Sequence, residues 1–547
     1  MQPTKLWRLK HSCFGLLLLS VALARPAMAD HIKDLQTRAK ETGRADWGYW
    51  GGSPDVYFGW KTHSNRLIPV YAYGQTLASV SGENSLYRNE AKITSLFGQL
   101  PKDTVNPNAE YFDQTDVYRL QTEAFAAGKK HVILLIFDGM DWQTTWAAAI
   151  HRAGQVKYRQ GPGSGLFIQD YRDYHTTASD FGFVVTSPHN HGTGCNVDAQ
   201  TVTNPGGSMV GGFCAARGGA TPWANADPAY LMGTGPELFH AVTDSASAGT
   251  SLMAGIKTYN DGINVDSAGK HVAPLGQTLQ ARGLGVGVVT SVPISHATPA
   301  CAYANNVNRD DYQDLTRDLI GLPSISHRGQ PLPGVDVLIG AGWGESSESD
   351  AGQGTNFIPG NRYMAEDDLA AINVEHGGKY QVAQRTAGRK GTDVLVEAAQ
   401  RAIQGGQRLL GYFGTSAGHL PFQTADGKYD PVPGVKAAEV YSEADVLENP
   451  TLADMTRAAL TVLEQNPKGF WLMVEAGDVD WANHDDNLDN SIGAVLSGDD
   501  AFRAIVEWVE RHKAWDDTVV LITADHGHML NLSEPEALLP PGPASPE

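Results

Sequence analysis

The sequence predicts an α/β protein, a three-layer sandwich with a mostly parallel central sheet, helices on both faces and loop-rich insertions. Two observations lead to this fold class. Short apolar runs rich in Val, Ile and Leu recur along the chain, and helix-like stretches lie between them. Unbroken apolar runs of this length are typical of strands buried on both faces, as in a parallel sheet covered by helices. Alternation of such strands with helices predicts layered α/β packing.

The predicted elements can be given in chain order. Strands are predicted for residues 131–137, 285–292, 335–342, 470–474 and 518–523, each ending in a polar cluster. Helices are predicted for residues 392–403, 452–464 and 501–512. The 547 residues suffice for one large domain with insertions, and we assign it to residues 30–547.

Two regions are expected to lie outside this regular pattern. Residues 30–128 show weak periodicity and are expected to form an N-terminal extension. Residues 160–235 are rich in Gly, Pro, Thr and Asn, which indicates a loop-like insertion near the active site.

Residues 1–29 have the pattern of a signal peptide. They open with basic residues, continue with an apolar run too short to span a bilayer, and end in Ala27-Met28-Ala29 before Asp30. An uncleaved anchor is the alternative interpretation. We expect an exported protein, periplasmic or extracellular, with no membrane span.

Composition and charge restrict the class of protein. A hydrophobic content of 41% and a charged fraction of 19% are those of a globular chain. The formal charge of −20 argues against nucleic acid as a specific partner, because a duplex would repel this surface. Cys195 and Cys214 can close a loop in an oxidising compartment, although the sequence does not establish that bond. Cys301 is expected to be a small buried residue.

Candidate metal ligands follow three of the predicted strands. They are Asp138, Glu475 with Asp480 and His484 behind it, and Asp525 with His526. Open α/β sheets bind ligands just outside the carboxyl ends of their strands, so these side chains are expected at one edge. Asp480 and His484 are four residues apart, the spacing of one helical face. Carboxylates mixed with imidazoles suit Zn²⁺, and an oxygen-only set suits Mg²⁺. Nearby Asp485, Asp486 and Asp489 are expected on the solvated surface.

Ser245 lies where a helix is expected to begin, within a run of small residues that reaches Ala254. Unpaired backbone N–H groups at a helix N-terminus favour a bound anion. No G-x-S-x-G elbow is present, so a hydrolase triad is not indicated, and metal coordination can activate the hydroxyl instead. Thr298 can add an oxygen ligand, and Arg309 can hold two phosphate oxygens in a bidentate fork.

Together these blocks resemble the motifs of alkaline phosphatases. The matching blocks are Phe137-Asp138-Gly139-Met140, Thr243-Asp244-Ser245-Ala246, His296-Ala297-Thr298-Pro299-Ala300 with Arg309 further on, Glu475 through Asp480 to His484, and Thr523-Ala524-Asp525-His526. They occur in the family's order and with its spacing inside each block, across residues 131–528. The resemblance implies hydrolysis of small-molecule phosphate monoesters through a phosphoserine intermediate, that is, a phosphoric monoester hydrolase.

The resemblance also implies two Zn²⁺ and one Mg²⁺ and gives each residue a role. Ser245 resembles the nucleophile, Arg309 the phosphate clamp, and Asp244 the residue that orients the clamp. The implied ligands are Asp138, Asp525 and His526 with Ser245 for the first zinc, Asp480 and His484 for the second, and Asp138, Thr298 and Glu475 for magnesium. His296 and Trp481 fall where family members vary, and are expected to tune magnesium occupancy and product release.

One departure from the family concerns the second zinc. The family's third ligand there is a histidine well downstream, but no histidine lies beyond His528 and the chain stops at Glu547. His528, two residues after His526, is not at the expected position. The sequence therefore looks C-terminally short, or another residue such as His419 substitutes. On this interpretation the second zinc site is incomplete and binds weakly.

Three rival functions remain at the level of sequence. A phosphodiesterase of the same superfamily usually has Thr at the nucleophile position, and a sulfatase needs a modifiable Cys in C-x-P-x-R, whereas Ser245 is followed by Ala246. A non-catalytic exported protein that binds metal or phosphate is the third. The natural substrate and the oligomeric state, a homodimer among the options, stay open.

Overall fold

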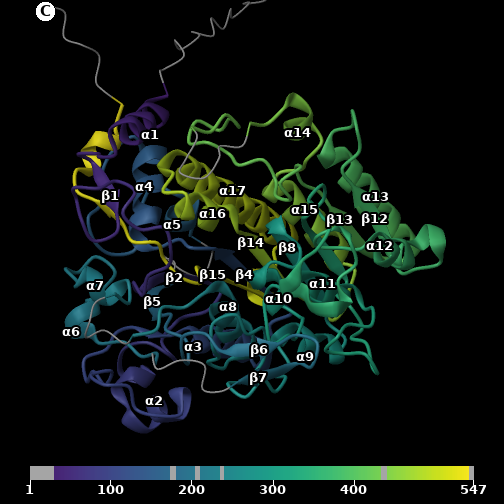
Figure 1. The fold of residues 1–547 in the computed structure, drawn as a ribbon, viewed down its shortest axis with the longest axis horizontal. Coiled ribbons are helices and arrows are strands. Elements are labelled where there is room, and N and C mark those ends of the chain that lie inside the picture. The colour runs from purple at the N-terminus through teal and green to yellow at the C-terminus, as the bar shows by residue number, and fades with distance from the viewer. Residues whose placement is uncertain (1–29, 173–179, 204–209, 235–239, 433–439, 541–547) are drawn as a thin grey trace, which may run out of the picture.

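The computed structural model describes residues 30–172, 180–203, 210–234, 240–432 and 440–540. The signal sequence predicted for residues 1–29 lies outside these ranges. A ten-stranded, mostly parallel sheet with helices on both faces forms the centre of the molecule, so the predicted α/β sandwich is confirmed (Figure 1). All five predicted strands belong to this sheet.

The order of strands brings the ligand-bearing segments together. Across the sheet the strands are β12 (Tyr380–Gln384), β13 (Arg408–Tyr412), β9 (Val337–Ala341), β8 (Gly285–Pro293), β14 (Phe470–Ala476), β4 (His131–Phe137), β15 (Thr518–Thr523), β2 (Ile68–Tyr73), β5 (Asp180–Val185) and β3 (Phe112–Asp113). Pairing is parallel from β12 to β15 and antiparallel between β15, β2 and β5. β14, β4 and β15, the strands that precede the candidate ligands, are thus direct neighbours.

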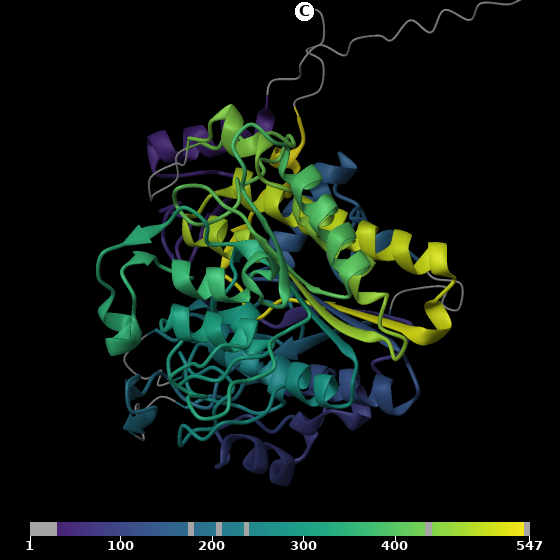
Figure 2. The same cartoon turned by 90° about the vertical axis from the view of Figure 1, so that its right-hand side faces the viewer.

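Helices cover both faces of the sheet. α13, α15 and α17 pack on one face with α4 beside α17, and α3, α8, α9 and α10 pack on the other. Figure 2 shows the green and yellow helices above the strands and the teal helices below them. Their bounds are α3 (Gln114–Ala126), α4 (Trp142–Ala153), α8 (Ser245–Ala254), α9 (Leu275–Ala281), α10 (Ala297–Cys301), α13 (Gly391–Gly405), α15 (Leu452–Leu463) and α17 (Leu488–His512).

The other α-helices include α16, which carries candidate ligands. The helices are α1 (His31–Thr42), α2 (Glu90–Phe97), α5 (Phe167–Asp170), α6 (Ala215–Gly218), α7 (Pro228–Leu231), α11 (Tyr312–Ile320), α12 (Glu366–Ile372), α14 (Glu443–Leu447) and α16 (Asp478–His484). Short antiparallel pairs join β1 (Gly48–Trp50) to β16 (Leu530–Leu532), β6 (Gly194–Asn196) to β7 (Thr201–Thr203), and β10 (Ser346–Ser347) to β11 (Gly360–Asn361).

α17 is longer than the helix predicted at residues 501–512. It begins after Asn487, whose side chain accepts from the Asn490 N–H as an N-cap. Gly493 and Gly498 weaken the helical pattern in the sequence, but both have a packing reason. A Cβ at Gly498 would lie 2.2 Å from the ring of Phe137, so the helix approaches β4 closely only with glycine there.

Residues 30–128, expected as an extension, contribute β2 and β3 to the central sheet. β2 lies antiparallel beside β15, so the start of β2 is at the edge where β15 ends. The N-terminal segment also meets the C-terminal part through the β1–β16 pair, and Figure 1 shows α1 close to the yellow end of the chain. The residues just before β2 are thereby placed at the ligand-bearing edge.

The other expectations concern the insertion, the cysteines and the membrane. Residues 160–235 contain α5 to α7 and the β6–β7 pair, and they also supply β5 to the central sheet. Cys195, Cys214 and Cys301 are all free in the structure, so the loop between Cys195 and Cys214 is not closed by a disulfide. Within the described ranges, every helix is too short or too polar to cross a bilayer.

Candidate active site

The candidate site lies at the carboxyl ends of three neighbouring strands. In the sheet register Ile136 of β4 is flanked by Glu475 on one side and Thr523 on the other. Asp138 and Asp525 follow two positions after Ile136 and Thr523, so the strand ends themselves gather the carboxylates. Their placement follows from parallel pairing, as expected for open α/β sheets.

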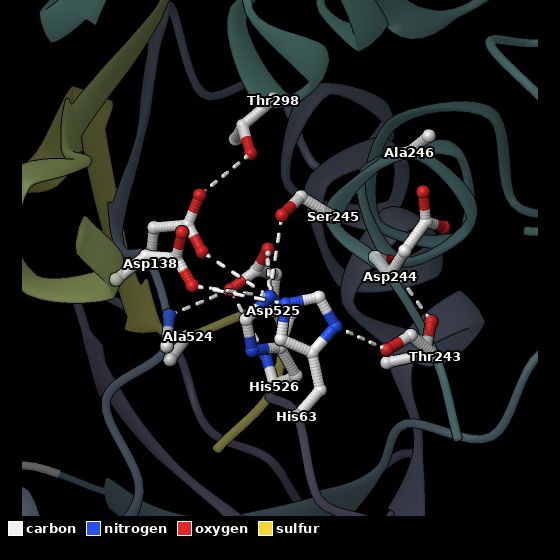
Figure 3. A network of polar contacts seen from close by, with 12 residues as sticks. His63, Asp138, Thr243, Asp244, Ser245, Ala246, Thr298, Ala524, Asp525 and His526 are labelled. Atoms are coloured by element: carbon white, nitrogen blue, oxygen red, sulfur yellow. Dashed lines mark hydrogen bonds and ion pairs between the residues drawn. The ribbon is translucent and has the colours of Figure 1, made fainter. Parts of the chain in front are cut away.

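The first ligand group consists of Asp138, Asp525 and His526, and it surrounds the hydroxyl of Ser245 (Figure 3). The Nε2 atom of His526 lies 3.3 Å from Asp138 Oδ1 and 3.4 Å from Asp525 Oδ2. The same nitrogen lies 3.2 Å from Ser245 Oγ. One cation placed among these atoms would therefore also reach the serine oxygen.

The hydrogen bonds of Asp525 leave one of its carboxylate oxygens unpaired, and Asp138 has one unpaired oxygen as well. Asp525 Oδ1 accepts from the backbone N–H groups of Gly139 and His526, each at 2.9 Å. Asp525 Oδ2 and Asp138 Oδ1 are buried and have no hydrogen-bond partner. Buried carboxylate oxygens are normally paired, so two orphaned oxygens facing one imidazole fit a metal site.

The electrostatics of the strand ends also favour a cation. Burial, followed by the charge of Asp525, raises the pKa of Asp138 well above its usual value. Burial likewise raises the pKa of Glu475 to about 8 and raises that of Asp525. Crowded buried carboxylates resist ionisation, and a bound divalent ion would reverse that effect.

Ser245 is the first residue of α8, and Asp244 caps the helix by accepting from the Ser247 N–H at 2.9 Å. The small residues of α8 allow this helix to pack tightly against its neighbours. A Cβ at Gly249 would lie 2.9 Å from Cys301 Sγ, so α8 and α10 approach at that point. Cys301 is fully buried beside α8, in keeping with its interpretation as a small core residue.

Arg309 reaches the same pocket and is held by Asp244. Its Nη1 donates to Asp244 Oδ2 at 3.0 Å, and its Nη2 lies 3.3 Å from His296 Nε2. Burial alone would raise the pKa of Asp244, but Arg309 and the Ser247 N–H hold it below its usual value. Arg309 therefore stays paired and oriented in the absence of substrate.

A second group shares Asp138 and contains Glu475 and His296. Thr298 Oγ1 donates to Asp138 Oδ2 at 3.4 Å, and Glu475 Oε2 accepts from Thr290 at 2.5 Å. Glu475 Oε1 is buried without a partner. His296, expected to act beside the metal, offers a ligand atom to this group.

The third group contains Asp480 of α16 with His63, His526 and His528, and His484 of the same helix adjoins it. Asp480 and His484 lie on one face of the helix, with His484 Nε2 3.4 Å from Asp480 Oδ1. His526 Nε2 is 3.8 Å from the same oxygen, so this group adjoins the group around Ser245. Burial would raise the pKa of Asp480, but the surrounding imidazoles hold it well below its usual range. The Asp480 carboxylate is therefore charged and can attract a cation.

Sequence reasoning missed His63 in the N-terminal segment. Its Nε2 lies 3.1 Å from His484 Nε2 and 3.8 Å from Asp480 Oδ1, and its ring stacks on His526 at 3.7 Å between centroids. The only signal in the sequence is a histidine shortly before the apolar run of β2. Nothing in the sequence shows that β2 lies beside β15.

The structure also places His528, which is not at the family's expected position, and His419, which the sequence suggests as a substitute ligand. His528 lies in the site, because its Nε2 is 2.6 Å from Asp480 Oδ1. His419 belongs to none of the ligand groups found among the described residues. Its ring stacks on Phe422 at 4.1 Å and meets the edge of Trp481. His419 thus supports a wall of the pocket and is not a substitute ligand.

Two carboxylates expected on the surface are buried. Asp489 Oδ1 accepts from the Ala425 N–H at 2.9 Å, and both Asp486 and Asp489 are fully buried. Their sequence pattern is that of a solvated acidic run, but packing of residues 421–432 against α17 covers Asp489. The prediction of a solvated surface is wrong for both.

A pocket of about 400 Å³ adjoins the site, and Ser245, His296 and Asp480 are among the residues that line it. Its polar side is formed by His63, Ser245, His296, Arg309, Asp480 and His484, and its apolar side by Phe422, Pro431, Val432 and Trp481. The described residues of the 160–235 insertion do not line it. A small anion can thus reach Ser245 while the rest of a substrate lies against an apolar wall.

Comparisons with known proteins point to one family. The chain is 30% identical over 288 residues to alkaline phosphatase 4 of Bacillus subtilis (strain 168), a match that covers 52% of this chain and 49% of that protein. It is 30% identical over 311 residues to the alkaline phosphatase of Escherichia coli (strain K12), covering 55% and 61%. The chain thus spans about half the length of the first relative and three fifths of the second.

Solved structures of the same kind are similar as well. The alkaline phosphatase of Thermus thermophilus aligns with 73% of this chain and 60% of its own at 20% identity and a TM-score of 0.44. The enzyme of the Antarctic bacterium TAB5 aligns with 73% and 80% at 19% identity and a TM-score of 0.43. The sequence model described as alkaline phosphatase matches residues 231–538, more than half of the 547 residues. The chain belongs to the alkaline phosphatase family.

Proposed function

We propose that the protein is a metal-dependent alkaline phosphatase that hydrolyses phosphate monoesters, with Ser245 as its nucleophile. One observation carries the proposal. Ser245 Oγ faces a buried group of two carboxylates and one imidazole, and Arg309 lies in the same pocket. This combination offers a nucleophile, positions for its activating ion and a clamp for the phosphoryl group.

The donor sets support the identity of the metals. Asp138, Asp525 and His526 would hold one zinc beside Ser245, and the α16 group would hold a second. Asp138, Glu475 and Thr298 offer oxygens suited to magnesium, with the His296 imidazole beside them. When bound, the ions would lower the pKa of the Ser245 hydroxyl, offset charge on the leaving oxygen and activate a water molecule.

The chain's own residues position the reaction. Arg309 holds two oxygens of the phosphoryl group in its fork, and Asp244 fixes that fork. Ser245 Oγ attacks phosphorus, the bond to the leaving oxygen breaks, and the alcohol departs toward the open side of the pocket. Water then cleaves the phosphoserine, which restores the Ser245 hydroxyl and releases inorganic phosphate. The N-terminus of α8 points positive charge at the phosphoryl group throughout.

The test is hydrolysis of p-nitrophenyl phosphate by Ser245→Ala and by the matched variant Ser251→Ala. Ser251 lies on the same helix, and its hydroxyl donates only to the Ser247 carbonyl. Ser245→Ala is expected to lose activity and phosphate incorporation from labelled substrate, and Ser251→Ala to keep both. Full activity in Ser245→Ala would exclude the proposal. Faster hydrolysis of bis-p-nitrophenyl phosphate than of p-nitrophenyl phosphate would favour a phosphodiesterase. Tight phosphate binding without turnover would favour a binding protein.

Export of the protein is part of the same proposal. The basic start, the short apolar run and the Ala27-Met28-Ala29 sequence of residues 1–29 support it. Fractionation of expressing bacterial cells tests it, with a variant lacking residues 2–29 as the control. Retention of the full-length chain in the cytoplasm would contradict export.

A further inference from the structure

We propose that His63, carried by the N-terminal segment, is the third protein ligand of the metal held by Asp480 and His484. His528 in turn positions Asp480 and does not bind the ion. The assignment rests on the proposed metal-dependent function and gives that function its complete second site. It replaces the expectation of a weak site, because the ligand expected downstream is supplied from the opposite end of the chain.

The distances among the candidate atoms distinguish a ligand from a supporting residue. Three ligands at 2.0–2.1 Å from a tetrahedral zinc lie about 3.3 Å apart. His63 Nε2, His484 Nε2 and Asp480 Oδ1 are separated by 3.1, 3.4 and 3.8 Å, which brackets that value. His528 Nε2 is only 2.6 Å from Asp480 Oδ1, which is the length of a hydrogen bond.

Hydrogen bonds to the far side of each ring set the direction of its lone pair. His63 Nδ1 lies 2.9 Å from the Thr243 carbonyl oxygen, and His484 Nδ1 lies 2.7 Å from that of Lys61. A carbonyl only accepts, so Nδ1 carries the hydrogen in both rings. In their neutral form, the two rings turn lone pairs toward each other across 3.1 Å, which is the arrangement of a pair of metal ligands.

The backbone fixes His63 in this place. The Ser64 N–H donates to the Gly527 carbonyl at 2.7 Å, so the residue after His63 pairs with the residue between His526 and His528. Lys61, two residues earlier, supplies the carbonyl that orients His484. A single short segment, residues 61–64, thus provides one ligand, orients a second and is anchored beside β15.

A ligand from the N-terminal segment links metal binding to docking of that segment. Zinc would stabilise only the state in which residues 61–64 are in place, because those residues complete its site. His63 lies outside residues 231–538, the part matched to the family. The chain therefore builds a family site with a residue from outside the family-matched region.

The experiment counts metal in the full chain after loading with zinc and dialysis, using mass spectrometry of the element and competition with a chromogenic chelator. Wild type is expected to keep two zinc ions. His63→Ala is expected to keep one, because the zinc affinity of the Asp480–His484 site should fall at least 100-fold. His528→Gln is expected to keep both, with a reduction of roughly 10–100-fold, as for loss of an outer hydrogen-bond partner. His376→Ala, at an exposed histidine remote from the pocket, is the matched control and should equal wild type.

A folding defect is separated from a ligand defect by two further measurements. His63→Asp restores a ligand atom and is expected to recover the second zinc. Hydrogen exchange of residues 48–66 should slow on zinc addition in wild type and not in His63→Ala. Retention of both zinc ions at wild-type affinity in His63→Ala, or loss of one in His528→Gln alone, would overturn the assignment. A wild-type chain that binds no zinc would overturn the proposed function and the assignment with it.

Discussion

Arg309 and Asp244 form an ion pair in the pocket, with Nη1 3.0 Å from Oδ2. Asp244 also caps α8, which begins with Ser245. One carboxylate thus orients both the helix that carries the nucleophile and the guanidinium that faces it. Because both tasks fall on the same side chain, the position of the clamp relative to Ser245 is set before substrate arrives.

Replacement of Arg309 by Lys tests this clamp. Lysine keeps the charge but loses the planar fork, so one of two hydrogen bonds to phosphate is lost, at a cost of about 1.5–3 kcal/mol. We expect kcat/KM for p-nitrophenyl phosphate to fall by about 10–100-fold, and phosphate to inhibit correspondingly less. Arg362→Lys, which pairs with Glu345 and Asp350 at another place, should leave both values unchanged. Equal phosphate inhibition in Arg309→Lys would show that Arg309 does not hold phosphate.

The apolar wall of the pocket predicts a preference among leaving groups. Trp481 lines the pocket and meets the ring of His419 at 5.2 Å between centroids. Trp481→Ala removes an aromatic surface worth about 1–2 kcal/mol to an aryl group packed on it. We expect KM for an aryl phosphate to rise by about 5–30-fold, with KM for glycerol phosphate nearly unchanged. The ratio of the two KM values decides the matter, and equal changes would show that the aryl group does not contact this wall.

Half of the ten strands of the central sheet can be predicted from the sequence, because these five strands are apolar runs. β2 is harder to recognise, since Pro69 interrupts its run and proline lacks the N–H that a central strand needs. In the structure β15 pairs only with residues 71–73 of β2, so Pro69 lies outside that ladder, and on the other side it stands opposite Phe183 of β5. β12 alternates polar and apolar residues at the edge of the sheet and carries no strong signal.

The candidate site likewise contains residues that can be predicted from the sequence and one that cannot. Asp138, Glu475 and Asp525 can be predicted because each belongs to the end of a recognisable strand. His63 cannot, because its place depends on the pairing of Ser64 with Gly527 near the other end of the chain. A contact of that kind is a property of the tertiary fold and leaves no periodic pattern in the sequence.

Removal of metal should change the effect of Asp138 on stability. In the chelator-treated protein, burial and then repulsion from the neighbouring carboxylates raise the pKa of Asp138. Asp138→Asn removes that repulsion, so at pH 8 we expect the stripped variant to be more stable than stripped wild type by about 1–3 kcal/mol. With zinc present the order should reverse, because the variant loses a ligand. Urea unfolding measures the unfolding free energy of both proteins with and without zinc. If the same protein is the more stable one in both conditions, the explanation by carboxylate repulsion is contradicted.

His240 should make the protein sensitive to mild acid. Its Nε2 lies 2.5 Å from Asn65 Nδ2, its ring stacks on Tyr230, and burial lowers its pKa to about 4. Since the unfolded histidine has its pKa near 6.5, the unfolded state takes up a proton first as the pH falls. The contribution of His240 is therefore complete above pH 6.5 and declines down to about pH 4, at roughly 1.4 kcal/mol per pH unit.

His240→Gln keeps an acceptor for Asn65 but cannot be protonated. From pH 6.5 to pH 5 we expect wild type to lose about 2 kcal/mol more unfolding free energy than this variant, because only wild type contains the titrating ring. Urea unfolding at pH 7, 6.5, 6, 5.5 and 5 measures the difference, with His376→Ala as the exposed control that should follow wild type. Parallel pH curves for wild type and His240→Gln would show that this histidine is already protonated, or accessible to protons, in the folded protein.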